Sequence, residues 1–402
     1  MKRIMILGAS ILQLPAIKEA RKMGLEVIAV DMDKEAIGFN YSDINLVIST
    51  TDTDRVLEAA KEYKIDGIIA VATDRPVKTV AKVCEQMNLS GIGIETANIT
   101  TNKYLMRQAF KENNVESPEF FKASNFEEFK DIAKHFISNG KKCIIKPVDN
   151  SGSRGVQLIE SLDYDKLKTD YEYCVKNSYS KDIVVEEFME GKEVSVETLS
   201  FNGKCNVIQI TDKRTTGSPN FVELGHNEPS LLPKDTIDKI KDLAIRANKA
   251  VGIKEGPSHT EIMVTEEGPK VVEIGARLGG DNISSYLVPL STGVDLVKAS
   301  IEIAIGNSPK IENTLNKASA ITYIESKKGI IKDIKGVDEA RKIDGVKKID
   351  ILKDIGDSTS NIHSSNDRLG FIISQADTVK KALEICEIAK DKILIDIVDG
   401  GK

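Results

Sequence analysis

Strand and helix patterns alternate through residues 2–95 of the chain. Apolar runs reading RIMILG, EVIAVD, INLVIST and DGIIAVA are separated by amphipathic segments such as LPAIKEARKMG and VKTVAKVCEQM. Because strands joined through helices run parallel, with the helices on the faces of the sheet, this alternation strongly restricts the fold. It predicts an N-terminal α/β domain built on a Rossmann-like parallel sheet.

A glycine after the first strand and an acid after the second, Gly8 and Asp31, also occur in dinucleotide-binding domains. The loop here reads GASILQLPAI, which lacks the three-glycine spacing that lets a pyrophosphate approach a helix N-terminus. We therefore expect this sheet to serve as a scaffold, or to form part of a substrate site, rather than to bind a dinucleotide.

Length and composition exclude several classes of protein. A chain of 402 residues is long enough for two or more domains. A net charge of -6, with lysines and acids interspersed, argues against nucleic-acid binding through a basic face. The five cysteines are scattered without metal-like spacing, which fits a reducing cytoplasm. We see no signal peptide and no apolar run long enough for a membrane anchor.

The segment from Gly256 to Asp281 reads as a β-hairpin that carries two acids. TEIMV and KVVEIGARL are strand-like, and TEEGP forms the turn between them. Antiparallel pairing would bring Glu261 and Glu273 together among apolar neighbours, where like charges need a neutralising cation such as Mg²⁺. Arg277 follows Glu273 by four residues, so on a strand it would share the same face and could stabilise a phosphoryl group. The alternative is an ordinary hairpin with the two acids on its solvent-exposed face.

A glycine-rich loop follows another strand earlier in the chain. Lys146 ends the strand KCIIKPV, and the loop DNSGSRGV comes next. Its backbone N–H groups could wrap phosphate oxygens, although it is not a Walker A loop because no Gly-Lys-Ser/Thr opens a helix there. A lysine-bearing helix, TTNKYLMRQAFKENNV, precedes it and is expected to open near Thr100 or Thr101. The alternative is a hairpin turn beside a surface lysine.

Two further segments are rich in polar groups. The segment IVVEEFMEGKEVSVE is predicted to form a strand, a connector and a second strand. It forms either a solvated acidic face or a connector that binds the adenine and the ribose of a nucleotide. Residues 207–233 form an expected long polar loop, and loops of this length inside a compact domain are often functional. It contains Glu223 and His226, for which a structural role is an alternative. His259 lies two residues before Glu261 and should share its strand face.

These motifs, in this order, resemble the ATP-grasp superfamily. The resemblance rests on IIKPVDNSGSRGV, VVEEFMEGKEVSVE, HTEIMV and VVEIGARLGGD, together with the N-terminal α/β domain. FVELGHNEPS, GPSHTEI and EIGARLGGD are most similar to the L-amino acid ligases, which form dipeptides. Many ATP-grasp enzymes have Asn two residues after the second metal glutamate, whereas this chain has Gly275, which leaves a third protein ligand for the metals in doubt.

The resemblance implies roles for individual residues. ATP would be bound by Lys103, Lys146, Ser151, Gly152, Ser153, Gly155, Glu186, Glu187, Phe188, Met189 and Glu193. The metal would be held by Glu261 and Glu273, and the catalytic residues would be Arg277 and Lys146. The substrates would be contacted by Glu223, His226, His259 and Arg277.

The resemblance also implies an architecture. It gives a pre-ATP-grasp domain over 1–95, an ATP-grasp core over 96–308 with a mobile lid at roughly 115–185, and a C-terminal α+β subdomain over 309–402. The fold class is α/β and α+β. The cofactors would be ATP and Mg²⁺, or Mn²⁺ in its place, and the partners would be small carboxylate and amine substrates, with a homodimer as the expected assembly.

The function implied is an ATP-dependent carboxylate–amine ligase that acts on amino acids through an acyl phosphate. One alternative is an ATP-grasp ligase of purine biosynthesis or of carboxyphosphate chemistry. Another is a nucleotide-binding protein without catalysis, against which the joint presence of Lys146, Glu261, Glu273 and Arg277 argues.

Overall fold

The computed structural model describes residues 1–217 and 222–398. Part of the predicted polar loop, 218–221, and the last four residues of the predicted C-terminal subdomain, 399–402, lie outside the described residues. Within the described ranges, none of the helices combines the length and the apolar character needed to cross a membrane.

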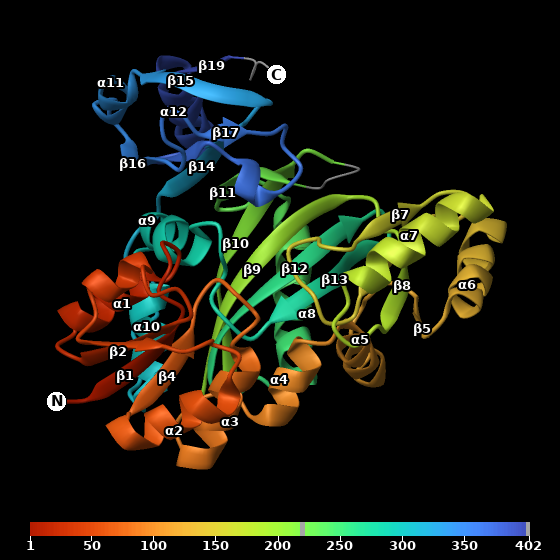
Figure 1. Cartoon of the computed structure of the whole chain (residues 1–402), viewed down its shortest axis with the longest axis horizontal. Coiled ribbons are helices and arrows are strands. Elements are labelled where there is room, and N and C mark those ends of the chain that lie inside the picture. The colour runs from red at the N-terminus through yellow and green to blue at the C-terminus, as the bar shows by residue number, and fades with distance from the viewer. Residues whose placement is uncertain (218–221, 399–402) are drawn as a thin grey trace.

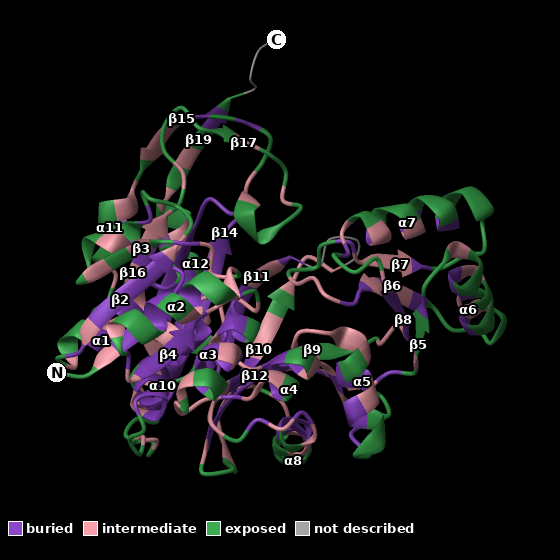
Figure 2. Ribbon diagram, turned by 60° about the horizontal axis from the view of Figure 1, so that its bottom comes forward, coloured by how far each residue is buried: buried purple, intermediate pink, exposed green. Residues whose placement is uncertain are grey.

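The N-terminal sheet is parallel, as the alternating pattern predicts (Figure 1). Its strands lie in the order β3-β2-β1-β4; β1, β2 and β4 are mostly buried, whereas the edge strand β3 is partly exposed (Figure 2). The strands are β1 (Arg3–Leu7), β2 (Glu26–Asp31), β3 (Ile44–Val47) and β4 (Gly67–Ala70), and the helices are α1 (Leu14–Lys22), α2 (Thr53–Tyr63) and α3 (Val77–Met87). A short 3-10 helix, η1 (Ile37–Asn40), follows β2.

The loop after β1 is filled by protein side chains rather than shaped for a pyrophosphate. The Asp31 carboxylate accepts a hydrogen bond of 2.7 Å from the backbone N–H of Ala9. The Gln13 side chain lies over Gly8 and donates to the backbone carbonyl of Val71 at 2.8 Å. This arrangement agrees with a sheet that serves as a scaffold or forms part of a substrate site rather than one that binds a dinucleotide.

A small antiparallel sheet and two helices project to one side of the molecule (Figure 1). The strands lie in the order β5-β8-β6-β7, with bounds β5 (Phe120–Ala123), β6 (Cys143–Pro147), β7 (Gln157–Ile159) and β8 (Ile183–Glu187). Helices α6 (Phe126–Ser138) and α7 (Tyr164–Lys176) pack on it, and helices α4 (Ile94–Thr100) and α5 (Lys103–Glu112) lead into it. The lysine-bearing helix α5 starts later than predicted, because the Asn102 side chain caps it by accepting from the backbone N–H of Leu105 at 3.1 Å.

An eight-stranded sheet forms the centre of the molecule, in the order β13-β12-β9-β10-β11-β14-β18-β16. Its strands are β9 (Lys192–Phe201), β10 (Lys204–Thr215), β11 (Glu223–Glu228), β12 (Gly256–Thr265), β13 (Gly268–Gly275), β14 (Ala318–Ile324), β16 (Val346–Ile351) and β18 (Gly370–Ala376). Helix α8 (Lys234–Ala250) packs on it. The prediction of a long polar loop over 207–233 is wrong, because β10 and β11 are antiparallel strands of this sheet.

The sheet continues past residue 309, so the C-terminal segment shares it rather than forming a separate layer. It adds a small sheet of β17 (Ser358–Thr359), β15 (Gly329–Lys335) and β19 (Leu394–Val398), with helices α11 (Val337–Arg341) and α12 (Val379–Lys392) and the 3-10 helix η3 (Ser365–Asp367). The π-helix η2 (Ile283–Leu287) and helices α9 (Val288–Thr292) and α10 (Leu296–Ala304) connect the two parts. Helices α9 and α10 are separated at Gly293, whose φ of +76° and proximity to Thr314 suit only glycine.

One buried carboxyl in this sheet predicts a dependence of stability on pH. Glu228 is fully buried, its oxygens accept from the Thr211 and Ser291 hydroxyls at 2.8 Å, and burial raises its pKa to about 8. Between pH 4.5 and 8 the folded state keeps a proton that the unfolded chain releases, so this group's contribution falls as the pH rises, by up to about 1.4 kcal/mol per pH unit. We expect Glu228→Gln to remove that slope.

Chemical denaturation of both proteins at pH 5, 6, 7 and 8 measures this effect. The free energy of unfolding of the variant should rise relative to the wild type as the pH increases. A constant difference across the series would show that Glu228 does not titrate in this window.

Candidate active site

The hairpin of β12 and β13 carries the two acids that the sequence places together. Glu261 and Glu273 are directly paired in the register of the two strands, as predicted. Each carboxylate contacts one lysine at 3.1 Å, Glu273 with Lys103 from α5 and Glu261 with Lys213 from β10. Among the described residues, no group of three or more His, Cys, Asp or Glu side chains is arranged to hold a metal ion.

Lys213 joins three acids and was not selected from the sequence. Its ammonium lies 3.7 Å from Glu223 on β11 and 3.1 Å from Glu261, and it also contacts Glu193 on β9. Burial alone would lower the pKa of Lys213, but Glu261, Glu193 and Glu223 outweigh it and raise the pKa above its ordinary value. Lys213 is therefore a permanent cation in the floor of the site.

A buried ion-pair triad positions Lys146. Glu186 contacts Lys146 at 2.8 Å and receives two hydrogen bonds from Arg107, of 2.7 and 3.1 Å. Arg107 also donates to the backbone carbonyls of Val271 and Val272 on the hairpin, at 3.3 and 2.7 Å. Burial would raise the pKa of Glu186, but Arg107 and Lys146 lower it to about 2. The Glu186 side chain thus orients Lys146, and Arg107 links α5, β8 and β13.

The glycine-rich loop closes one side of the cavity. Its backbone turns through left-handed conformations at Gly152, Ser153 and Gly155, with φ of +66°, +55° and +80°. At Gly155 a Cβ would also lie 2.7 Å from Pro147 and from Asn177, so only glycine lets the loop fold back onto the end of β6. The loop meets the hairpin through Lys103, whose ammonium donates to the backbone carbonyl of Asn150 at 2.9 Å.

Arg277 lies just beyond the end of β13 rather than on the strand, and its partner comes from the N-terminal domain. Its guanidinium donates twice to Asp74, at 2.8 and 3.3 Å. Burial would lower the pKa of Arg277, but Asp74 outweighs it and raises the pKa. A Cβ on Gly275 would lie 2.8 Å from the Asp74 carboxylate, so the lack of a side chain at this position leaves room for Asp74.

His259 lies on the same face of β12 as Glu261, as predicted. Its Nδ1 donates to Glu197 on β9, and its Nε2 lies 3.5 Å from the Glu261 carboxylate. Burial would lower the pKa of His259, but Glu197 raises it to about 9, so the ring is a cation at neutral pH. Glu197 is itself held by the Ser284 hydroxyl at 3.1 Å.

Glu223 and His226, two of the residues expected to contact substrate, lie in a second network of charged side chains. His226 Nε2 lies 3.5 Å from Asp281, and Arg368 donates to both oxygens of Asp281 at 3.0 Å. Arg368 also donates to Glu223 at 3.1 Å and brings the C-terminal segment to the site. The Glu223 carboxylate thus lies between two cations, Lys213 and Arg368.

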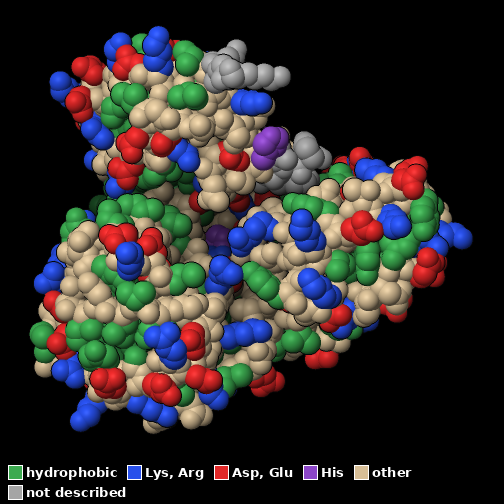
Figure 3. Space-filling view, in the orientation of Figure 1, with side chains coloured by type: hydrophobic (Ala, Val, Ile, Leu, Met, Phe, Trp, Pro, Cys, Tyr) green, Lys and Arg blue, Asp and Glu red, His purple; other side chains and the backbone are tan. Residues whose placement is uncertain are grey.

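Almost all of the residues predicted to form the active site line two connected cavities. Figure 3 shows the molecule hollowed between the C-terminal strands and the segments below them, with Lys and Arg side chains at the rim. A cavity of about 220 Å³ is lined by Lys103, Lys146, Ser151, Gly152, Ser153, Glu186, Glu187, Phe188, Met189, Glu193, Glu223, His259, Glu261, Glu273 and Arg277. It opens into a cavity of about 750 Å³ that includes His226 and part of the N-terminal domain. Gly155 lies outside both linings and shapes the loop.

Comparisons with known proteins agree with this arrangement. Residues 139–285 match the ATP-grasp domain, and residues 322–398 match the L-amino acid ligase C-terminal domain 2. The L-arginine-specific L-amino acid ligase of Bacillus subtilis is 25% identical over 82% of this chain and 80% of its own length.

Two solved structures share the fold along the chain. The L-amino acid ligase from Bacillus licheniformis has a TM-score of 0.84 at 23% identity and covers 99% of both chains. The phosphoribosylglycinamide synthetase from Anaerococcus prevotii has a TM-score of 0.81 at 24% identity and covers 99% of this chain and 100% of its own. The chain is therefore an ATP-grasp ligase whose C-terminal domain is of the L-amino acid ligase type.

Proposed function

We propose that this chain is a carboxylate–amine ligase that couples ATP cleavage to formation of an amide bond, with amino acids as substrates. The observation that carries the proposal is the meeting of two acids, two lysines and an arginine in one cavity that opens into a larger one. Phosphoryl transfer needs positioned charge rather than a protein nucleophile, and this cavity supplies it.

The nucleotide lies in the smaller cavity. Lys103 and Lys146 bind phosphate oxygens, and the backbone N–H groups of the loop from Ser151 to Gly155 cover them. The connector after β8 holds the base, with Phe188 and Met189 against the ring, and Glu193 accepts from the ribose hydroxyls. Glu186 acts here through Lys146, because its own carboxylate is buried in the pair with Arg107.

The donor set at the hairpin fits a hard divalent cation. Glu261 and Glu273 offer paired carboxylate oxygens, and Mg²⁺ commonly uses one or two carboxylates together with substrate phosphates. Lys103 and Lys213 contact these two carboxylates in the structure, and bound phosphates would attract the lysines away from the carboxylates. When bound, the metal would neutralise charge on the transferring phosphoryl group.

The reaction proceeds in two steps. An oxygen of the substrate carboxylate attacks the γ-phosphorus, and the bond to the β-γ bridging oxygen breaks, which gives ADP and an acyl phosphate. The neutral amine of the second substrate then attacks the carbonyl carbon, and the bond from this carbon to the phosphorylated oxygen breaks. Inorganic phosphate leaves with that oxygen and takes up the proton that the amine loses. Arg277 and the cationic His259 stabilise negative charge on these oxygens, and Glu223 and His226 orient the amino acid in the larger cavity.

Release of ADP and phosphate from Mg-ATP tests the proposal. Amino acids are supplied singly and in pairs, and bicarbonate and phosphoribosylamine form separate arms. We expect release to require one or two amino acids, with a condensed product in the mass spectrum. Two other results would favour the alternative instead. One is release that requires phosphoribosylamine with glycine, the substrates in the name of a Methanocaldococcus jannaschii relative that is 24% identical to this chain. The other is release that requires bicarbonate.

A further inference from the structure

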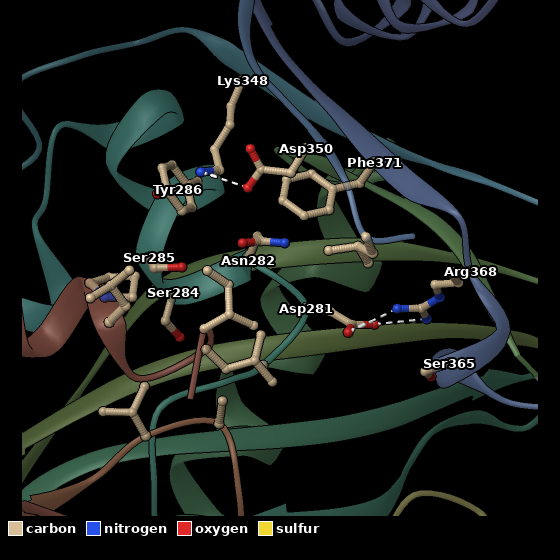
Figure 4. A pocket seen from close by; sticks show the side chains of 18 of the residues that line it. Asp281, Asn282, Ser284, Ser285, Tyr286, Lys348, Asp350, Ser365, Arg368 and Phe371 are labelled. Carbon is tan, nitrogen blue, oxygen red and sulfur yellow. Dashed lines mark hydrogen bonds and ion pairs between the residues drawn. The ribbon is translucent and has the colours of Figure 1, made fainter. Parts of the chain in front are cut away.

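A third pocket lies beside the larger cavity, between the N-terminal domain and the C-terminal strands. Its volume is about 330 Å³, and it is bounded by the loop after β1, by the segment from Asn282 to Tyr286, and by residues of β16 and β18. Figure 4 shows it with Tyr286, Lys348, Asp350 and Phe371 at one end and the pair of Asp281 and Arg368 at the other. None of the roles proposed above for nucleotide, metal or phosphoryl transfer uses this space.

The pocket adjoins the larger cavity and shares part of its wall. Six residues line both: Leu12, Ala72, Gly280, Asp281, Ser365 and Asn366. Asp281 follows Arg277 by four residues and Glu273 by eight, so the wall of the pocket begins where the catalytic hairpin ends. A substrate in the larger cavity therefore lies next to the pocket, within reach of a group attached to it.

Its lining is mainly apolar. Three aromatic rings contribute, those of Tyr286, Tyr323 and Phe371. Ile11, Leu12 and Leu352 also line it and are 48%, 41% and 44% exposed, so aliphatic surface is grouped around one opening. A ligand that covers these side chains removes apolar surface from water, and its binding is thereby favoured.

The charged groups of the pocket disfavour a cationic ligand and do not require an anionic one. Lys348 pairs with Asp350 at 2.8 Å, and Arg368 pairs with Asp281 at 3.0 Å (Figure 4). The Arg368 guanidinium also lies 3.7 Å from the centre of the Tyr323 ring. Lys18 and Lys353 also line the pocket. The lysines would repel a cationic ligand, whereas an uncharged ligand would leave both ion pairs intact.

We infer that this pocket receives a bulky, uncharged side chain, of aromatic size, from one of the two amino acid substrates. The inference rests on the proposed ligase function and specifies its substrate class. The side chain would lie against Tyr286 and Phe371, while the reacting carboxylate or amine remains near Arg277 in the larger cavity.

The first test is a substrate series in the ADP-release assay with the full-length enzyme. Alanine, leucine, phenylalanine, tryptophan and arginine are each paired with a common partner, in both the carboxylate and the amine position. We expect kcat/KM to rise from alanine to phenylalanine by tenfold or more in one position, and arginine to be poor in that position. Tandem mass spectrometry of the product shows which substrate carries the bulky side chain.

A variant that narrows the pocket provides the second test. Leu352→Trp adds volume at a half-exposed position that lines this pocket and not the larger cavity. We expect the ratio of kcat/KM for phenylalanine to that for alanine to fall at least tenfold. Ile37→Trp is the matched control, because Ile37 is 41% exposed on the N-terminal domain and lines none of the three cavities.

The outcomes separate this inference from the ligase proposal. Two results would overturn the pocket assignment and leave the ligase function standing. One is amino-acid-dependent turnover without a preference for bulky uncharged side chains. The other is an unchanged ratio of kcat/KM for phenylalanine to that for alanine in Leu352→Trp. Absence of any amino-acid-dependent turnover overturns both.

Discussion

Replacing Arg277 with alanine should lower kcat by on the order of 10²–10³, the typical loss when one preorganised donor to a developing oxyanion is removed. Arg277 is held in the cavity by two hydrogen bonds to Asp74, so its guanidinium is fixed before the substrates arrive. Arg277→Lys keeps the charge but loses the planar fork, and we expect intermediate activity. The measurement is single-turnover formation of ADP at saturating substrates.

Binding of ADP, measured by calorimetry, should change only a few-fold in Arg277→Ala, since the proposed base contacts come from the connector after β8 and the proposed ribose contact from β9. Arg246→Ala is the matched control, because Arg246 also pairs with two acids, Asp242 and Glu116, but on the outer surface. Equal losses of kcat in the two variants, or an unchanged kcat in Arg277→Ala, would remove Arg277 from the chemistry.

The largest effect on stability is expected at Glu186. Glu186→Gln keeps the shape of the side chain but leaves Arg107 and Lys146 as buried cations without their carboxylate. Breaking a buried ion pair in this way typically costs about 3–5 kcal/mol of unfolding free energy. Because Glu186 also orients Lys146, we expect KM for ATP to rise as well. Denaturant unfolding and steady-state kinetics measure the two effects.

The acid sensitivity of the wild type gives an independent check. The lowered pKa of Glu186 means that its contribution is present above about pH 4.5 and is lost as the pH falls toward 2. Glu160→Gln, which removes a surface pair with Lys142 at 3.0 Å, should leave the unfolding curve unchanged. A Glu186→Gln protein as stable as the wild type would show that the triad does not support the fold.

The parts predictable from sequence are those in which a local pattern determines the geometry. Alternating strands and helices gave the parallel N-terminal sheet, because such connections leave few topologies. The closeness of Glu261 and Glu273 followed from the hairpin, but their direct pairing depends on a β-bulge between Glu261 and Ile262 that shifts the register set at the turn by one residue.

The parts that sequence reasoning missed depend on contacts between distant segments. Asp74 and Arg277 are 203 residues apart, Arg107 and Glu186 are 79 apart, and Arg368 and Asp281 are 87 apart. No local pattern reports such pairs. The segment containing Lys213 and Glu223 was misread as a loop for a related reason: its strands are polar because they line the cavity, and polar sequence normally indicates a loop.

Transfer of ¹⁸O tests the acyl-phosphate route most directly. An amino acid labelled with ¹⁸O in its carboxylate is condensed with a second amino acid in unlabelled water, and the inorganic phosphate is analysed by mass spectrometry. The route predicts one ¹⁸O atom in each phosphate released with product. Condensed product accompanied by unlabelled phosphate would mean that the substrate carboxylate is not phosphorylated, and would contradict the central claim.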